Sequence, residues 1–401
     1  MKRLFLIAAS FSALGLAACQ ETGAPASLAV DASACDLAAP TADAAGEGCA
    51  RSWIDANLKM NDMQVLGTHN SYKQWISPNE LQLFAERSPA HAKALEYAHE
   101  PIPAQLDWGI RQLEIDIVYD PEGGVYLDPL LRRQVIERGL GAPDLAFKEE
   151  LAKPGFKVMH VPDIDYRTSC PTLVACLTQI RNWSKAHPDH APMFIMLNTK
   201  DSAVDIPGAA PVRRFDAAAW DALDAEVLSV FPRTSLITPA DIQGDYASVR
   251  EGVLADNWPV LGEARSRVMI GILASRTSTE PYRNVSGGIK TRPMFVRAVS
   301  ADPDAAWLMW DDPIVNQDAI HQAVKDGFIV RTRTEQDTVE VRANTTVKRS
   351  AAFASGGQYI STDYYKPNLN FSDYAVAMPG GAIARCNPLR AADKCGDARI
   401  E

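Results

Sequence analysis

Residues 112–118 read Gln-Leu-Glu-Ile-Asp-Ile-Val, a short apolar run in which two carboxylates alternate with large aliphatic side chains. Successive side chains of an extended strand point to opposite faces. Glu114 and Asp116 therefore share one face, and the aliphatic residues beside them share the other. A strand that ends in two acids is typical of a parallel barrel, where catalytic side chains stand at the carboxyl ends of the strands.

Seven further apolar runs of strand length lie along the chain, and segments of helical periodicity separate them. Eight repeats of strand and helix are the signature of a (β/α)8 barrel. We therefore predict an α/β fold, a TIM-like (β/α)8 barrel that forms a single domain. The predicted strands are residues 63–67, 112–118, 157–160, 193–197, 267–273, 305–310, 328–332 and 358–362, and the predicted helices include residues 172–186, 217–230, 314–325 and 335–354.

The first eighteen residues indicate export, because a basic start and an apolar run precede small residues and Cys19. The apolar run is shorter than the roughly 20 residues that a spanning helix needs. Residues 16–19 (Leu-Ala-Ala-Cys) resemble a bacterial lipobox, which implies that Cys19 is acylated; an ordinary secretory cleavage is the alternative. We predict a lipoprotein signal peptide over residues 1–18, a flexible tether over 19–50 and the barrel domain over 51–401.

The chain is acidic, with a net charge of −10 that becomes −12 when the leader removes Lys2 and Arg3. Binding to a nucleic-acid backbone depends on clustered Lys and Arg, so we expect no nucleic-acid partner. We expect a monomeric lipoprotein of the cell envelope, on the periplasmic face or the outer membrane. Its expected partner is a phospholipid at a membrane surface.

Six cysteines remain besides Cys19, an even number in an exported chain, which favours disulfides. Metal-type Cys-x-x-Cys spacing is absent from the sequence. The simplest of the fifteen possible connectivities joins sequence neighbours, and the others stay open. These neighbours are Cys35 with Cys49, Cys170 with Cys176, and Cys386 with Cys395.

Polar side chains gather at the carboxyl ends of the predicted strands, which meet at one rim of a barrel. Two histidines there could supply a base and an acid near neutral pH. Two neighbouring carboxylates repel each other unless one is protonated or both share a hard cation. The strand-end residues are His69, Asn70, Glu114, Asp116, His160, Asn198, Arg331, Arg333 and Asp363.

Several of these segments together resemble the bacterial calcium-dependent phosphoinositide phospholipase C family, over roughly residues 60–388. The resemblance implies that His69 and His160 are catalytic and that Arg333 and Asp363 bind the substrate. It also implies a Ca²⁺ ion held by Asn70, Glu114, Asp116 and Asn198. The segments are LGTHNSY (66–72), LEIDI (113–117), VMHVPDID (158–165), PMFIMLNTKD (192–201), VRTRT (330–334) and QYISTDY (358–364).

The sequence departs from related enzymes at three places. Asn198 stands where calcium-dependent relatives often carry glutamate, which removes one negative charge unless Asp201 or another acid compensates. Asp116 and His160 are 44 positions apart, and the insertion between them could shape the entrance to the site. Residues 267–273 lack the lysines that grip ring phosphates in relatives, so we expect unphosphorylated phosphatidylinositol as substrate.

The resemblance implies cleavage of phosphatidylinositol to diacylglycerol and a cyclic inositol phosphate, by histidine acid–base catalysis with calcium. A glycerophosphodiester phosphodiesterase is one alternative, although its usual motif has arginine where this chain has Asn70. A sphingomyelin-type phosphodiesterase and a non-catalytic, head-group-binding lipoprotein are the others. For Arg333 the alternative to substrate binding is a buried ion pair with an acid such as Glu335.

Overall fold

A computed structural model describes residues 35–401 except 203 and 397. The predicted signal peptide (residues 1–18), the acylation site Cys19 and residues 20–34 lie outside the described residues. In the part of the chain that is described, no helix combines the length and the apolar character needed to cross a bilayer.

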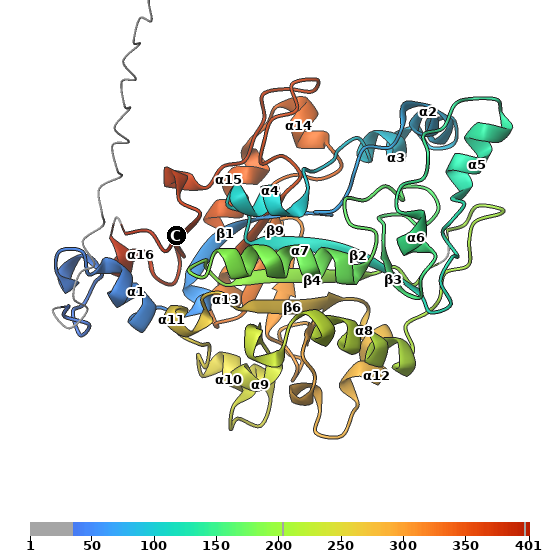
Figure 1. Ribbon diagram of the computed structural model, residues 1–401. Coiled ribbons are helices and arrows are strands. Elements are labelled where there is room, and N and C mark those ends of the chain that lie inside the picture. The colour runs from blue at the N-terminus through green and yellow to red at the C-terminus, as the bar shows by residue number, and fades with distance from the viewer. Residues whose placement is uncertain (1–34, 203, 397) are drawn as a thin grey trace, which may run out of the picture.

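Eight parallel strands in the order β5, β6, β4, β2, β1, β10, β9, β8 curl into a barrel wall (Figure 1). A further short parallel strand, β7, also pairs with β6. This architecture confirms the predicted α/β, TIM-like barrel. The strands are β1 (Met63–Thr68), β2 (Gln112–Asp120), β3 (Gly155–Val158), β4 (Met193–Thr199), β5 (Leu236–Ile237), β6 (Val268–Leu273), β7 (Phe295–Val296), β8 (Trp307–Met309), β9 (Ile329–Arg333), β10 (Tyr359–Thr362) and β11 (Ala384–Cys386).

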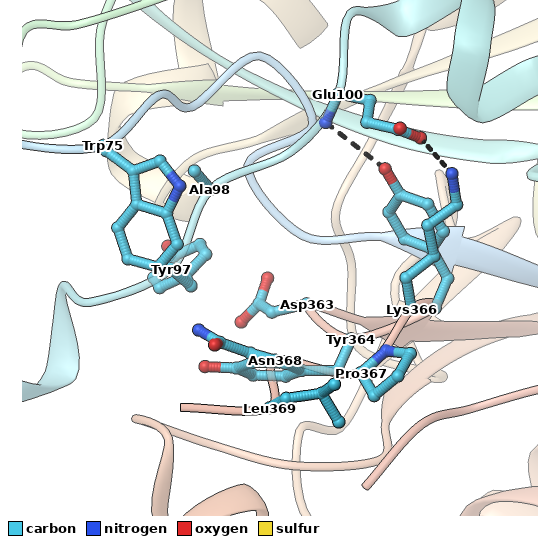
Figure 2. Close-up of a pocket in the computed structure, with 11 residues that line it drawn as sticks. Trp75, Tyr97, Ala98, Glu100, Asp363, Tyr364, Lys366, Pro367, Asn368 and Leu369 are labelled. Atoms are coloured by element: carbon cyan, nitrogen blue, oxygen red, sulfur yellow. Dashed lines mark hydrogen bonds and ion pairs between the residues drawn. The ribbon is translucent and has the colours of Figure 1, made fainter. Parts of the chain in front are cut away.

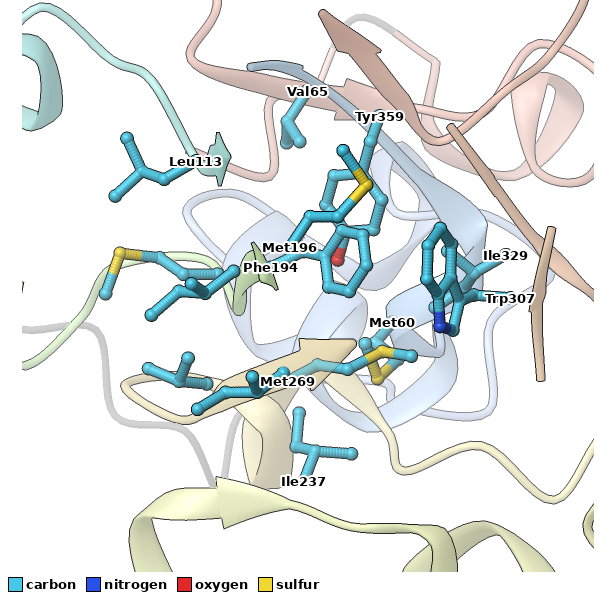
Figure 3. Close-up of a cluster of buried hydrophobic side chains, with 14 of the residues drawn as sticks. Met60, Val65, Leu113, Phe194, Met196, Ile237, Met269, Trp307, Ile329 and Tyr359 are labelled. Atoms are coloured by element: carbon cyan, nitrogen blue, oxygen red, sulfur yellow. The ribbon is translucent and has the colours of Figure 1, made fainter. Parts of the chain in front are cut away.

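Large side chains fill the lower part of the barrel. Phe194, Trp307 and Tyr359 are fully buried, and Figure 3 shows them meeting from three different strands. Gly271 of β6 makes this packing possible, because a Cβ there would lie 2.7 Å from Nε1 of Trp307 and 2.9 Å from the ring of Phe194. The site is therefore carried on a solid core, as expected for this class of barrel.

The predicted third strand, residues 157–160, is not a strand of the barrel. Residues 155–158 form β3, which pairs antiparallel with the end of β2, with Val158 opposite Ile117. The fourth predicted strand, β4, takes the place beside β2 instead. Two short strands, β5 and β7, were not predicted, because two residues carry no detectable periodicity.

The predicted helices over residues 172–186 and 217–230 are present as α7 and α8. Side-chain caps fix where they begin, since Thr172 accepts from the amide of Ala175 and Asp216 from that of Ala219. The helices are α1 (Ala50–Asn57), α2 (Pro78–Arg87), α3 (Pro89–Ala94), α4 (Ile102–Asp107), α5 (Leu130–Glu137), α6 (Lys148–Leu151), α7 (Leu173–Ala186), α8 (Ala217–Val230), α9 (Pro239–Gln243), α10 (Val249–Leu254), α11 (Leu261–Ala264), α12 (Arg276–Arg283), α13 (Gln317–Lys325), α14 (Val339–Ala343), α15 (Val347–Ala354) and α16 (Ala392–Cys395).

The predicted helix over residues 335–354 is wrong as a single element. Asp337 and Thr338 have φ values of 51° and 64°, and Asn344 has a φ of 50°. Left-handed residues interrupt a right-handed helix. The segment therefore forms two short helices, α14 and α15, instead of one long one.

All three predicted disulfides are present: Cys35–Cys49, Cys170–Cys176 and Cys386–Cys395. The first lies inside the segment predicted to be a tether, and there Ala42 is buried and donates its amide hydrogen to the carbonyl of Lys394. Residues 35–49 therefore pack on the domain near α1 and α16 (Figure 1). A flexible tether stays a prediction for residues 19–34, outside the described residues.

Candidate active site

A cavity of about 400 Å³ opens beyond the carboxyl ends of β1, β9 and β10. Four of the predicted site residues line it, namely His69, His160, Arg333 and Asp363. The two imidazole rings are edge-on to one another, with centroids 6.4 Å apart. Two histidines on either side of one cavity can serve a single substrate as proton acceptor and proton donor.

His69 directly follows β1, and its Nδ1 lies 3.2 Å from Oδ1 of Asp363, which directly follows β10. These strands are parallel neighbours with Thr68 opposite Thr362, so the register sets the two side chains beside each other. Burial, together with the charge of Arg333, lowers the pKa of His69 to about 4. The ring is therefore neutral near pH 7, and with a proton on Nδ1 its basic nitrogen is Nε2.

His160 lies two residues beyond β3, and its Nδ1 is 2.9 Å from Oδ2 of Asp165. A tight turn brings them together: Val161 bridges to Asp165, and Asp163 has a left-handed φ of 68°. β2 extends past the rim, and β3 pairs antiparallel with that extension, so β3 brings the chain back toward the carboxyl ends of the barrel strands. His160 thus reaches the cavity although it does not end a barrel strand, which corrects its predicted placement.

Asp165 is fully buried and lies 3.3 Å from Nζ of Lys73, which is also fully buried. Burial opposes ionisation, but Lys73 and His160 outweigh it and hold the pKa of Asp165 below its usual value. The carboxylate is therefore charged and accepts a hydrogen bond from Nδ1 of His160, which turns Nε2 away from Asp165. The sequence prediction missed both residues, although Asp165 stands only five positions after His160.

The predicted metal ligands are not among the residues that line this cavity. Glu114 and Asp116 are buried on β2, and Asp116 is directly opposite Asn198 of β4. Asn70 has a left-handed φ of 49°, a conformation that asparagine adopts more readily than most residues. In residues 35–401 apart from 203 and 397, no group of three or more His, Cys, Asp or Glu side chains could hold a metal ion. The predicted set contains only two such side chains, since its other members are amides.

The carboxamide of Asn70 tests whether a cation fits here. Turned with its nitrogen toward Asp116, it donates to both carboxylate oxygens at 3.3 Å and accepts from Nε2 of His160 at 3.2 Å and from the hydroxyl of Tyr97 at 2.7 Å. In the opposite orientation the amide oxygen of Asn70 lies 3.3 Å from each carboxylate oxygen of Asp116, and no hydrogen separates the three oxygens. Such a cluster of carboxylate and amide oxygens is the ligand type that Ca²⁺ prefers. The donor set therefore fits calcium in one of the two orientations.

Two cations of the chain itself already contact these carboxylates. Nη2 of Arg331 lies 3.0 Å from Oε2 of Glu114, and Nζ of Lys200 lies 2.7 Å from Oδ2 of Asp116. Burial raises the pKa of Glu114 to about 8; Arg331 opposes this shift and Asp116 adds to it. The sequence prediction assigned no role to Arg331 or Lys200. Asp201, considered as a substitute acid, accepts a hydrogen bond from Ser278 and lines a different hollow.

Arg333 is buried, and its Nη2 lies 3.1 Å from Asp363 and 3.3 Å from Nδ1 of His69. The ion-pair alternative for this arginine is therefore realised, with Asp363 as the hydrogen-bonded partner in place of Glu335. Among the described residues, none accepts a hydrogen bond from Nε of Arg333, although that nitrogen is buried. An unpaired buried guanidinium donor is suited to an anionic group in the cavity.

A second hollow of about 240 Å³ adjoins the cavity and shares Tyr97 and Asp363 with it. Figure 2 shows Asp363 between Trp75 on one side and Leu369 on the other. Trp75 is 51% exposed and Leu369 is 79% exposed. This rim combines a large aromatic and an aliphatic side chain with solvent contact beside the predicted catalytic pair.

The insertion between Asp116 and His160 carries α5 and α6. Leu131 and Val135 of α5 pack with Leu83 of α2, and Phe84 of the same helix lines the cavity. Figure 1 shows α2, α3, α5 and α6 gathered at the end of the barrel opposite α1 and α16. The insertion thus supports one wall of the entrance to the site.

A family model described as phosphoinositide phospholipase C, Ca²⁺-dependent, matches residues 58–388. No curated protein matches the chain. Among solved structures, calcium-dependent phosphoinositol-specific phospholipase C from the Gram-negative bacterium Pseudomonas sp. (apo form, myoinositol complex) is 15% identical, with a TM-score of 0.48; the match covers 82% of this chain and 96% of the other. The Ca²⁺-dependent phosphatidylinositol-specific phospholipase C from Streptomyces antibioticus is 15% identical, with a TM-score of 0.47 and coverage of 77% and 95%.

Proposed function

The chain belongs to the calcium-dependent phosphoinositide phospholipase C family, and we propose that it cleaves phosphatidylinositol into diacylglycerol and a cyclic inositol phosphate. One observation carries the proposal: two Asp–His pairs, His69 with Asp363 and His160 with Asp165, face a single cavity. Attack of a hydroxyl on phosphorus needs a proton removed on one side and another supplied on the other.

In this proposal Nε2 of His69 accepts the proton of the inositol 2-hydroxyl. The 2-oxygen bonds to phosphorus, and the bond from phosphorus to the diacylglycerol oxygen breaks. His160 gives its Nε2 proton to that leaving oxygen, so the products are diacylglycerol and a cyclic phosphodiester. Asp363 and Asp165 keep the Nδ1 proton of each ring in place, which directs Nε2 toward the substrate. For Asp363, predicted to bind substrate, we propose this orienting role.

Calcium would be held by Asn70, Glu114, Asp116 and Asn198, the residues whose oxygen donors suit it. When bound, it supplies positive charge that acidifies the attacking hydroxyl and balances charge on the phosphate. The unpaired Nε of Arg333 supports a second contact to the phosphate or the inositol ring. Because β6 carries no lysine, we propose unphosphorylated phosphatidylinositol as the preferred head group.

We further propose that the rim of Trp75 and Leu369 meets the membrane surface that contains the substrate. Side chains of this kind partition favourably into the lipid interface. Acylation of Cys19 would hold the protein at the cell envelope, on the periplasmic face or the outer membrane. Lys366 lies 4.5 Å from the ring of Trp108 near the same rim, and such a cation can attract anionic lipid.

The rate of head-group release from lipid vesicles of defined composition tests this function. We expect the purified protein to release head group from phosphatidylinositol in calcium, and His160→Ala to lower kcat by about 10³-fold. His321→Ala is the matched control, because this partly exposed histidine lies on α13, away from the residues that line the cavity, and its Nε2 lies 3.2 Å from the carbonyl of Ala354. If His160→Ala keeps kcat within threefold of the parent, or if only sphingomyelin or glycerophosphoinositol is cleaved, the proposed function is wrong.

A further inference from the structure

Lys200 occupies an unusual place beside the predicted calcium ligands. It directly follows β4, and its amide donates to the carbonyl of Ile117 at 2.9 Å, which fixes the backbone against β2. Its Nζ lies 2.7 Å from Oδ2 of Asp116. Asp116 is fully buried, whereas the Lys200 side chain is 23% exposed and reaches the carboxylate from the rim.

Each of the two predicted carboxylate ligands already contacts a positive charge of the chain. Nη2 of Arg331 lies 3.0 Å from Glu114, and Nζ of Lys200 lies 2.7 Å from Asp116. Asn70 and Asn198, the remaining predicted ligands, add no charge. A divalent cation added to this set would lie close to two fixed cations, and like charges a few ångströms apart repel strongly where water is excluded.

Of the two cations, only Lys200 can leave. Arg331 is 2% exposed, and its guanidinium is also held by Ser361 and by Asp311. Lys200 has a flexible stem of four methylene groups with access to solvent, so its ammonium can rotate into water at small cost.

We propose that Lys200 is an internal competitor of calcium, whose ammonium group occupies Asp116 in the metal-free protein and is displaced when the metal binds. This inference rests on the proposed function, because it concerns the same metal site. Its consequence is a calcium affinity well below what the oxygen ligands alone would give. Calcium binding and movement of Lys200 are then one coupled event.

Calorimetric titration of the full protein with calcium tests the competition without measuring activity. We expect Lys200→Met, which removes the charge and keeps the length of the side chain, to bind calcium at least tenfold more tightly than the parent. Lys200→Arg keeps the charge and should bind within about threefold of the parent. Lys185→Met, on the exposed last turn of α7, is the control for loss of one positive charge and should leave the affinity unchanged.

A second measurement keeps the test valid if Lys200→Met folds poorly. With lysines labelled by ¹³C-methylation, the Lys200 signal, identified by its loss in Lys200→Arg, should shift on addition of calcium. Equal calcium affinity of Lys200→Met and the parent, or a Lys200 signal that calcium does not move, would overturn the inference. If those results came with normal phosphatidylinositol cleavage, the function would stand and only the competition would fail. If Lys200→Met bound calcium more tightly but the parent cleaved no phosphatidylinositol, the competition would stand and the proposed function would be wrong.

Discussion

At the scale of single residues, the orientation of His160 depends on Asp165, and the charge of Asp165 depends on Lys73. Nδ1 of His160 lies 2.9 Å from Asp165 in a partly buried contact, and Nζ of Lys73 lies 3.3 Å from Asp165 in a fully buried one. Lys73 also donates to the backbone carbonyls of Leu95 and Tyr97, two residues that line the cavity. It therefore links the cavity wall to the His160–Asp165 pair. Lys73 therefore contributes both to the stability of the fold around the cavity and to the orientation of His160, the proposed general acid.

We predict that Asp165→Asn lowers kcat on phosphatidylinositol by about 10³-fold with little change in KM, because His160 loses the partner that fixes its Nδ1 proton. The same change should cost about 3 kcal/mol of stability, since it leaves Lys73 buried without a counter-charge. Steady-state kinetics and urea denaturation measure the two effects.

The double variant Lys73→Met/Asp165→Asn separates orientation from stability. Removal of both charges should restore part of the free energy of unfolding but none of kcat. Recovery of kcat along with stability would mean that Asp165 acts only as a structural residue.

The sequence was sufficient to nominate residues at this scale where the register of the backbone decides their position. His69, Asn70, Glu114 and Asp116 follow from strand ends and alternation alone. Lys200 and Asp165 did not, because an ion pair depends on the rotamers of two side chains from different elements. Both stand in segments that carry the family resemblance, so their neighbourhood could have drawn attention to them.

At the scale of elements, β3 explains how the second histidine arrives. The predicted barrel strand at residues 157–160 is an antiparallel extension of β2, and its apolar residues pack on the long end of that strand. Sequence periodicity identified it as extended but could not give its direction, because parallel and antiparallel strands share the same alternation. The direction is set by pairing, which is a tertiary property.

A partly buried acid of a neighbouring helix contacts β3. Glu226 of α8 accepts the amide hydrogen of Phe156, and burial raises the pKa of its carboxyl group to about 7. In the unfolded chain this group titrates near 4.5. Between these pH values the folded protein holds one proton more than the unfolded chain, so its stability falls as the pH rises.

We predict that Glu226→Gln removes this pH-dependent loss. The stability of the variant relative to the parent should rise between pH 4.5 and pH 7, by on the order of 2 kcal/mol after allowance for partial exposure. Urea denaturation at pH 5 and pH 8 measures it. A constant difference between the two proteins at both pH values would show that Glu226 is ionised in the folded state.

The broken helix over residues 335–354 shows a different limit of sequence reasoning. Its apolar stripe at positions 339, 343, 347 and 351 has helical spacing, and both α14 and α15 are indeed helical. Asn344 is the residue that ends the first of them, and asparagine adopts the left-handed region more readily than most residues. Spacing alone does not show whether such a residue takes that conformation.

At the scale of the whole molecule, the barrel has two distinct ends. Residues 35–57 and α16 cover the amino ends of the strands, while α2, α3 and the insertion surround the cavity (Figure 1). The rim of Trp75 and Leu369 lies at the second end, beside the predicted catalytic dyads. The barrel itself was predictable, because seven of the eight apolar runs in the sequence form its parallel strands. The segments that cover the two ends of the barrel could not be predicted, because their sequences show no repeating hydrophobic pattern.

We predict that Trp75→Ala/Leu369→Ala weakens binding to phosphatidylinositol vesicles at least about tenfold, since two apolar side chains would no longer enter the interface. Leu254→Ala is the control: this residue is 44% exposed at the end of α10, whose Val253 lies against Gly327 at the amino end of β9. Vesicle sedimentation measures both. Equal loss in the control, or none in the rim variant, would place the membrane contact elsewhere.

The most direct test of the whole account is the product of the reaction, followed by phosphorus NMR of the purified protein with phosphatidylinositol in calcium and then in chelator. We predict the signal of a five-membered cyclic inositol phosphate in calcium, its absence in chelator, and its absence with both His69→Ala and His160→Ala. An acyclic phosphate formed without the cyclic species, or a cyclic product that forms equally well in chelator, would contradict the proposed roles of the histidine pairs and calcium.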